Sequence, residues 1–143
     1  MNNQPIDTNN AANAANTVNA VNTVNQVPVT PARISYDDFA KVEIRAGKIL
    51  SAEKVPDTDK LLKLSVDFGA FESTPRQIVS GISMYFPDPA VLVGKTCMFV
   101  TNLEPRKIKG FESQGMLMAV DGKDGAPVFI TPEVEVDNGS KIR

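Results

Sequence analysis

The chain has 143 residues, of which 42% are hydrophobic, and this suits one domain with an ordinary core plus a tail. Its formal net charge is only −2, so any site for a polyanion must come from local clustering of cations. The sequence contains no histidine and one cysteine, Cys97, which removes the commonest general base, most zinc sites and any disulfide within one chain. We therefore expect no catalytic residue, no metal site and no cofactor.

The N-terminal 33 residues differ in composition from the rest of the chain. They are rich in Asn, Ala, Thr and Val, with almost no charge and no aromatic residue. Valines recur at positions 18, 21, 24 and 27, but the intervening Asn and Thr are poor helix formers, and so thin a stripe does not offset the entropy lost on ordering. This composition predicts a flexible linker or tail at residues 1–33, with a weakly helical oligomerisation arm as the alternative. The domain itself is expected at residues 34–143.

The first half of this domain predicts one helical turn and three strands. Ser35 followed by Asp38 is a capping signal for a single helical turn. Residues 42–55 alternate between apolar and polar side chains, which is typical of a long strand, and Gly47 within them suggests a bulge or a sharp coil. A turn rich in Pro and Asp follows at 55–60, then strands at 61–69 and 76–82.

The second half predicts a helical turn at 89–93, ended by Gly94, and strands four and five at 96–103 and 115–120. Asp-Gly pairs at 121–125 indicate a turn before a further short strand at 127–132, and the last residues suggest one more turn and a short extended piece. Short strands separated by turns favour a small barrel or a sandwich. The helical turn before strand four favours an all-β, five-stranded Greek-key OB barrel, with a C-terminal extension packed against its outside.

The loop between strands four and five concentrates positive charge. Arg106, Lys107 and Lys109 lie there, followed by Gly110. Two strands joined by a basic, glycine-bearing loop place cations and backbone donors at the rim of a sheet, which suits a polyanion. Arg106 is a weaker candidate than the two lysines, because Glu104 is near enough in sequence to neutralise it.

Several segments together resemble the tRNA-binding domain family. They occur in family order and spacing and read FAKVEIRAGKIL, DKLLKLSVDFG, RQIVSGI, LVGK, Asn102-Leu103 and GFESQGMLMA. The family includes the C-terminal domain of bacterial methionyl-tRNA synthetases, endothelial-monocyte-activating-polypeptide-like proteins, stand-alone tRNA-binding proteins and a secretion-chaperone-like branch. The resemblance covers about residues 34–143 and departs mildly at Ala46 and Val120, where Val and Ala are commoner. It implies an OB fold, a homodimer formed outside the barrel, and binding to the folded shape of tRNA.

OB barrels bind nucleic acid through strands two and three and the loops one–two and four–five. The cations in those elements, which we expect near phosphates, are Lys60, Lys63, Arg76, Arg106, Lys107 and Lys109. Polar residues that match the family pattern and can bond 2′-hydroxyls are Ser80, Ser83, Asn102 and Ser113. Met116, beside the loop, offers a soft surface for a base, and a merely solvated strand face is the alternative for Lys63.

The leading hypothesis is a non-catalytic tRNA-binding module that assists a methionyl-tRNA synthetase as its appended C-terminal domain. The opening SYDDFAKVEIR after a low-complexity linker is similar to the synthetase-appended form. Expected partners are tRNA and a second copy of the chain, with a synthetase catalytic domain as a further candidate. The alternatives are a dimeric peptide-binding, secretion-chaperone-like protein and a module that only dimerises. The absence of a secretory signal or a run of 18 apolar residues predicts a cytoplasmic location without a membrane anchor.

Overall fold

The structure is a computed structural model of the chain that describes residues 30–143. The predicted tail at 1–33 falls almost entirely outside these residues. The predicted helical turn is present as α2 (Tyr36–Phe39), and the Ser35 hydroxyl accepts a hydrogen bond from the Asp38 backbone N–H at 3.0 Å, as a capping residue does. Residues 40–143 form a separate compact unit, and the remaining elements all belong to it.

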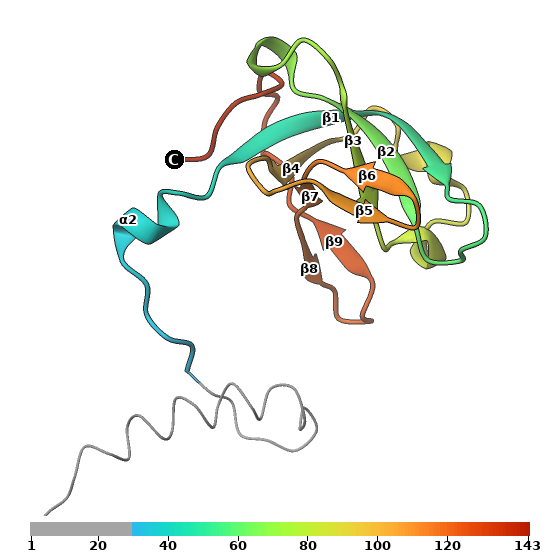
Figure 1. The fold of residues 1–143 in the computed structure, drawn as a ribbon, viewed down its shortest axis with the longest axis horizontal. Coiled ribbons are helices and arrows are strands. Elements are labelled where there is room, and N and C mark those ends of the chain that lie inside the picture. Colours follow the sequence, from blue (N-terminus) through green and yellow to red (C-terminus); the bar gives the residue numbers. More distant parts are fainter. Residues whose placement is uncertain (1–29) are drawn as a thin grey trace, which may run out of the picture. The chain divides into compact units, whose positions relative to one another are not determined.

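Five antiparallel strands form the main sheet in the order β3–β2–β1–β4–β7 (Figure 1). Their bounds are β1 Ile44–Lys54, β2 Leu62–Asp67, β3 Arg76–Ser80, β4 Thr96–Val100 and β7 Met116–Leu117. The Gln114 N–H donates to the Gln77 carbonyl at 2.9 Å, which brings the chain just before β7 to the free edge of β3. The sheet therefore curls into a nearly closed barrel, and the predicted five-stranded, all-β OB-like fold is confirmed.

Strand β1 is long because different parts of it pair with two other strands, β4 and β2. Its first residues, 44–48, pair with β4, and residues 48–54 pair with β2. The register shifts between Ile49 and Ser51, so the bulge predicted at Gly47 is wrong in position. Gly47 pairs regularly with Cys97, and a Cβ at Gly47 would lie 2.6 Å from Phe68 Cε1. The glycine is needed for close packing of the ring rather than for a bend.

The core follows the alternation of the strands. In β2 every second side chain is buried, beginning with Leu62, as the sequence predicts. Phe68 and Phe99 pack edge to face with ring centroids 5.6 Å apart. The predicted turn before β4 is the 3₁₀ helix η3 (Pro89–Leu92), whose Leu92 side chain is buried against the barrel. Two further 3₁₀ turns, η1 (Gly69–Phe71) and η2 (Ser83–Tyr85), flank β3.

The strand predicted at 115–120 is divided in two. At Met118 three backbone hydrogen bonds form a triangle: Met118 N–H to Met98 O at 3.0 Å, Met98 N–H to Ile130 O at 2.9 Å, and Ile130 N–H to Met118 O at 3.2 Å. Met98 uses its carbonyl to bond Met118 and its N–H to bond Ile130, so β4 no longer pairs with the chain after Met118. From Met118 onward that chain leaves the barrel. It continues as β8 (Ala119–Asp121), which pairs with β9 (Pro127–Phe129) across the predicted turn.

The segment predicted as a plain loop between strands four and five contains a short hairpin. Its strands are β5 (Arg106–Ile108) and β6 (Phe111–Ser113). The C-terminal extension lies along the first residues of β1, 44–46, on the edge where β2 pairs only with residues 48–54. There the Gly139 N–H donates to Ala46 O at 2.7 Å, and the Ile142 N–H donates to Ile44 O at 2.9 Å. The predicted packing of a C-terminal extension against the barrel is thus present as backbone pairing.

Candidate nucleic-acid interface

The β5–β6 hairpin turns through two residues, Lys109 and Gly110. Their φ angles are 51° and 86°. Both positive values are typical of the type I′ turn, whose twist matches that of the flanking strands. The pairing is Lys107 opposite Glu112 and Ile108 opposite Phe111. The tight turn therefore fixes where each cation of the hairpin projects.

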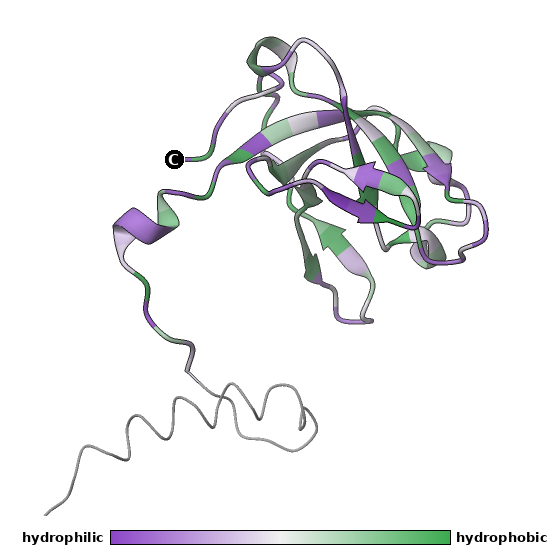
Figure 2. Cartoon of the chain, viewed as in Figure 1, coloured by the Kyte–Doolittle hydropathy of each residue, from purple (hydrophilic) through white to green (hydrophobic). Residues whose placement is uncertain are grey.

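The two faces of the hairpin differ in exposure. Ile108 and Phe111 are half-buried on one face, whereas Lys107 and Glu112 are exposed on the other. In Figure 2 the ribbon of each strand, β5 and β6, carries hydrophilic colouring over part of its length. The hairpin thus rests on the barrel through its apolar residues and turns its charge to solvent.

Ser113 fastens the hairpin to the barrel. Its hydroxyl accepts from the Val79 N–H at 3.0 Å and donates to the Gly115 carbonyl at 3.2 Å, and the residue is buried. The Gln77 amide adds a bond to the Glu112 carbonyl at 2.9 Å. The Ser113 hydroxyl, predicted as a ligand contact, is therefore fully used inside the protein, and we leave it out of the proposed interface.

The cations of the hairpin are available to a ligand. In residues 30–143, no carboxylate lies within ion-pair distance of Arg106, Lys107 or Lys109. Lys63 is different, because its Nζ lies 3.3 Å from Glu53 Oε2 and 5.0 Å from the centre of the Phe111 ring. Lys63 thereby links β2 to the hairpin, and its charge is already shared.

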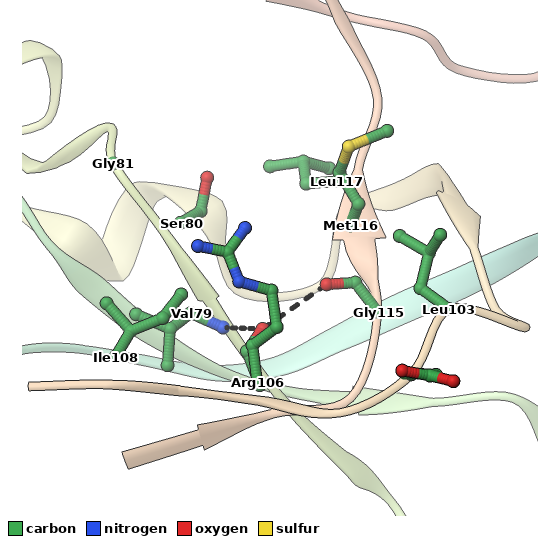
Figure 3. Close-up of a pocket in the computed structure, with 11 residues that line it drawn as sticks. Val79, Ser80, Gly81, Leu103, Arg106, Ile108, Gly115, Met116 and Leu117 are labelled. Atoms are coloured by element: carbon green, nitrogen blue, oxygen red, sulfur yellow. Dashed lines mark hydrogen bonds between the residues drawn. The ribbon is translucent and has the colours of Figure 1, made fainter. Parts of the chain in front are cut away.

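A cleft of about 470 Å³ opens between the hairpin and strands β3 and β7 (Figure 3). Arg106 stands in the middle of this view, with Ser80 on one side and Met116 on the other. The residues that line the cleft include Ser80, Gly81, Leu103, Glu104, Arg106 and Met116. The structure thus brings together four of the predicted site residues, Ser80, Arg106, Ser113 and Met116, in one hollow beside Lys107 and Lys109.

Two other predicted contacts serve as internal fasteners. The Arg76 guanidinium pairs with Glu72 and donates to the Thr101 and Gln114 carbonyls. The Asn102 amide donates to Lys41 O and accepts from the Glu43 N–H at 2.8 Å. Both side chains join segments distant in sequence through hydrogen bonds to the protein itself.

Lys60 and Ser83 lie at another place. The Ser83 N–H donates to the Lys60 carbonyl at 3.0 Å, which ties η2 to the β1–β2 loop. Ser83 is buried at the edge of a separate hollow of about 250 Å³, which Lys54 and Asp59 also line. The Lys60 side chain is exposed on the loop, whereas the buried Ser83 offers little surface to a ligand.

Sequence reasoning missed seven residues of the cleft, which are Val79, Gly81, Leu103, Glu104, Ile108, Gly115 and Leu117. Leu103 is exposed and lies three residues after β4, and its place in the Asn102-Leu103 segment that resembles the family is a signal that could have indicated it. Arg45 has a structural role, because its guanidinium carbon lies 3.7 Å from the centre of the Phe71 ring and its Nη1 donates to Gly139 O at 2.8 Å. It holds the C-terminal extension.

Neither a metal centre nor a membrane span is evident in the described part of the chain. Among residues 30–143, no three His, Cys, Asp or Glu side chains are grouped so that they could hold a metal ion. No helix in the same range has the length and apolar character needed to cross a bilayer.

Comparison with known proteins gives consistent matches. The family model described as a putative tRNA binding domain matches residues 44–141. Methionine–tRNA ligase of Methanospirillum hungatei is 52% identical over 116 residues, which are 81% of this chain and 16% of the ligase. The enzyme of the same name from Parabacteroides distasonis is 46% identical over 110 residues, 77% of this chain and again 16% of the ligase. The chain therefore spans about one sixth of the length of these relatives.

Solved structures agree with the sequence matches. A MetRS-related protein from Pyrococcus horikoshii superimposes with a TM-score of 0.71 at 40% identity, covering 79% of this chain and all of that one. The chaperone CsaA from Bacillus anthracis gives a TM-score of 0.68 at 28% identity, covering 78% of this chain and all of that one.

Proposed function

This chain belongs to the family described as the putative tRNA binding domain, and from that premise we propose that it binds folded tRNA through phosphate contacts and backbone shape. The observation that carries the proposal is the hairpin with three cations, Arg106, Lys107 and Lys109, that lack a carboxylate partner within residues 30–143. An isolated cluster of this kind on a chain of net charge −2 gives local affinity for a polyanion. Lys60, exposed on the β1–β2 loop, remains a further proposed contact.

Phosphate contacts of this kind bring a defined salt dependence. Each cation placed at a phosphate releases counterions, so the logarithm of the binding constant falls by about 0.7 to 0.9 per contact for each tenfold rise in salt. Such contacts carry no base sequence, and folded RNA is then distinguished by the spacing of its backbone and its 2′-hydroxyls. We expect tRNA to bind more tightly than duplex or single-stranded DNA of equal charge.

The experiment compares these nucleic acids in gel-shift titrations at several salt concentrations. The test variant is Lys107→Gln with Lys109→Asn, because Glu112 lies opposite Lys107 and a reversal to Glu would add cross-strand repulsion within the hairpin. We expect weaker tRNA binding and a salt slope reduced by about 1.4 to 1.8 for the two contacts removed, with the fold retained. The matched control is Lys95→Gln with Lys123→Gln, which removes two exposed lysines on other elements. Equal losses in both double variants, or no preference of the wild type for tRNA, would contradict the proposal.

We also propose that the chain supplies tRNA to a methionine–tRNA ligase. The support is the similarity to that ligase over most of this chain. A tethered or associated RNA-binding module raises the effective concentration of tRNA at the enzyme. The measurement is the KM for tRNA of a methionine–tRNA ligase from the same source, with and without this chain. A lower KM with unchanged kcat is expected, and an unchanged KM would refute it.

We further propose a homodimer that uses the β8–β9 hairpin. Val120 and Val128 face each other across its strands, and their exposed fractions are 53% and 52%. Such a paired apolar surface outside the barrel favours contact with a second copy. Sedimentation should give a dimer for the wild type and a monomer for Val120→Lys with Val128→Lys. A monomeric wild type would exclude this proposal.

A peptide-binding chaperone is the second candidate, because a chaperone, CsaA, shares the fold at 28% identity. It predicts that the chain suppresses light scattering by an aggregating client and has no preference for tRNA. The cytoplasmic location predicted from the sequence stays a prediction.

A further inference from the structure

We propose that the cleft between the β5–β6 hairpin and strands β3 and β7 holds one unpaired nucleobase, so that the module reads a splayed-out nucleotide beside the backbone it contacts. The inference rests on the proposed function, since it names the part of the RNA that enters the site. It adds a base contact to recognition that otherwise depends on phosphates and shape.

The size and the walls of the cleft suit a base. Its volume of about 470 Å³ lies within the range of roughly 300 to 1,000 Å³ that is typical of small-molecule sites. Leu103 and Met116 line it, and their exposed fractions are 48% and 49%. These two side chains expose apolar surface to water, and a bound base would cover it. A nucleobase, with apolar faces and polar edges, matches a hollow that combines apolar walls with a few polar groups.

The distribution of charge decides which end of a nucleotide enters. Glu104 lines the cleft, and within the described residues no cation lies within ion-pair distance of it. An acidic side chain and apolar walls repel a phosphate from the interior. Lys107 and Lys109, which lie on the same hairpin outside the cleft lining, attract phosphates to the rim. The sugar–phosphate backbone therefore stays along the hairpin while the base points inward.

Two side chains can hold the faces of the base. The Arg106 side chain stands between the Ser80 side and the Met116 side of the cleft (Figure 3). A planar guanidinium stacks on a base, and unpaired bases in RNA are commonly held on such planes. Met116 offers a polarisable thioether as a second contact. The Glu104 oxygens accept hydrogen bonds from an exocyclic amino group, so adenine, guanine or cytosine should be preferred to uracil.

Gly81 provides a way to close the cleft without disturbing the barrel. It lines the cleft, and a Cβ built on it meets no heavy atom within 4 Å. Its φ is outside the left-handed region, so a larger side chain carries no backbone strain there. Gly81→Leu should fill the hollow and leave every cation in place. Ala90→Leu, on the exposed surface of η3, is the matched control for an added leucine.

The test uses the full chain and three RNA hairpins with the same stem: fully paired, with one bulged adenosine, and with one bulged uridine. Fluorescence anisotropy measures their affinities, and tRNA binding is measured in parallel. We expect the bulged adenosine to bind about 5-fold or more tightly than the paired stem, which corresponds to one stacked base. Gly81→Leu should lose this preference while keeping the salt slope, Ala90→Leu should keep both, and Glu104→Gln should reduce the preference for adenosine over uridine.

Each result has a defined meaning. A wild type that binds tRNA but does not distinguish the three hairpins overturns the base site and leaves the proposed function standing. A wild type that fails to bind tRNA removes the proposed function itself. If Gly81→Leu does not fold, Met116→Ala, at a half-exposed position, serves in its place and should weaken the preference. Retention of the preference for bulged adenosine in a folded Gly81→Leu chain also contradicts the inference. So does an apolar peptide that displaces RNA from the wild type and fails to bind Gly81→Leu alone.

Discussion

At the scale of the residue, Lys109 combines charge with an unfavourable backbone. In residues 30–143 it is one of two non-glycine residues with positive φ, at 51°, and the other is Asp57 at 62°. A side chain in this region costs about 1 to 2 kcal/mol for most residues, whereas Asn tolerates it. A lysine at this turn position therefore lowers the stability of the hairpin. Its positive charge at the turn is the functional property that offsets this cost.

Lys109→Asn should raise stability and lower affinity together. Asn is the residue preferred before Gly in a type I′ turn, so the free energy of unfolding should rise by about 1 kcal/mol. The loss of one phosphate contact should weaken tRNA binding. Thermal melting and gel-shift titration measure the two effects. Lys107→Gln is the control, because it removes one charge outside the turn. If Lys109→Asn melts no higher than Lys107→Gln, the backbone argument fails.

Gly47 illustrates a residue whose role only packing explains. Gly47→Ala would bring a methyl group to 2.6 Å from Phe68 Cε1 and from Val66 Cγ1. Overpacking of a core typically costs about 1 to 3 kcal/mol, so urea denaturation should show a loss of that order. Gly81→Ala, where the added Cβ meets nothing, should change stability far less. Equal effects of the two alanines would disprove the packing role.

At the scale of the element, the C-terminal extension is held to the barrel by one carboxylate as well as by backbone pairing. Asp67 Oδ1 accepts from the Gly69 N–H at 2.9 Å, and its Oδ2 accepts from the Asn138 amide at 2.9 Å. The Gly69 bond, followed by the Asn138 bond, lowers the pKa of Asp67 below its ordinary value. The ionised form is therefore the one that the folded state stabilises.

The sign of the pH effect follows from this lowered pKa. The stability that Asp67 contributes is fully present above its unfolded pKa and is lost as the pH falls through the lower, folded pKa. Asp67→Asn should cost about 1 kcal/mol at pH 7, because the amide NH₂ donates and cannot accept, so one of the two bonds is lost. Melting temperatures between pH 7 and pH 2 should then fall less steeply for the variant than for the wild type. Parallel curves would exclude Asp67 as the titrating group.

The sequence predicted the main elements well where apolar and polar residues alternate and Pro or Gly marks the ends of the segment. Strands β1 to β4 and the turn η3 follow from apolar alternation and from Pro and Gly at their ends. The β5–β6 hairpin was missed because its strands are three residues long and its turn is Lys-Gly rather than Asn-Gly. The division of the fifth strand at Met118 depends on a backbone partner, Ile130, that no local pattern indicates.

At the scale of the whole molecule, Cys97 reports on the integrity of the barrel. Its exposed fraction is 0%, and burial raises the pKa of its thiol. Labelling by a thiol reagent should therefore be very slow in the folded chain and fast in denaturant. Saturating tRNA should slow it further, since a ligand that binds only the folded state suppresses opening. Rapid labelling under native conditions would contradict the buried position of Cys97.

The candidate site could be predicted in its charges and in part of its cleft, where Ser80 and Met116 lie. Charge and glycine in sequence indicated Arg106, Lys107 and Lys109, and the structure places all three on one hairpin. Polar residues were predicted by type, yet the hydroxyl of Ser113 and the amide of Asn102 bond inside the protein. Whether a hydroxyl or an amide faces a ligand or its own chain is decided by distant segments, which a linear pattern does not contain.

The backbone triangle at Met98, Met118 and Ile130 has a consequence for cooperativity. The β8–β9 hairpin is local in sequence and can form early, but the triangle joins three segments and is complete only when β4, β7 and the end of β9 are all in place. Displacing any one of these three residues breaks its backbone hydrogen bonds to the other two. Barrel and hairpin should therefore unfold in a single transition, and a partner that holds the hairpin would slow the opening of the barrel as well.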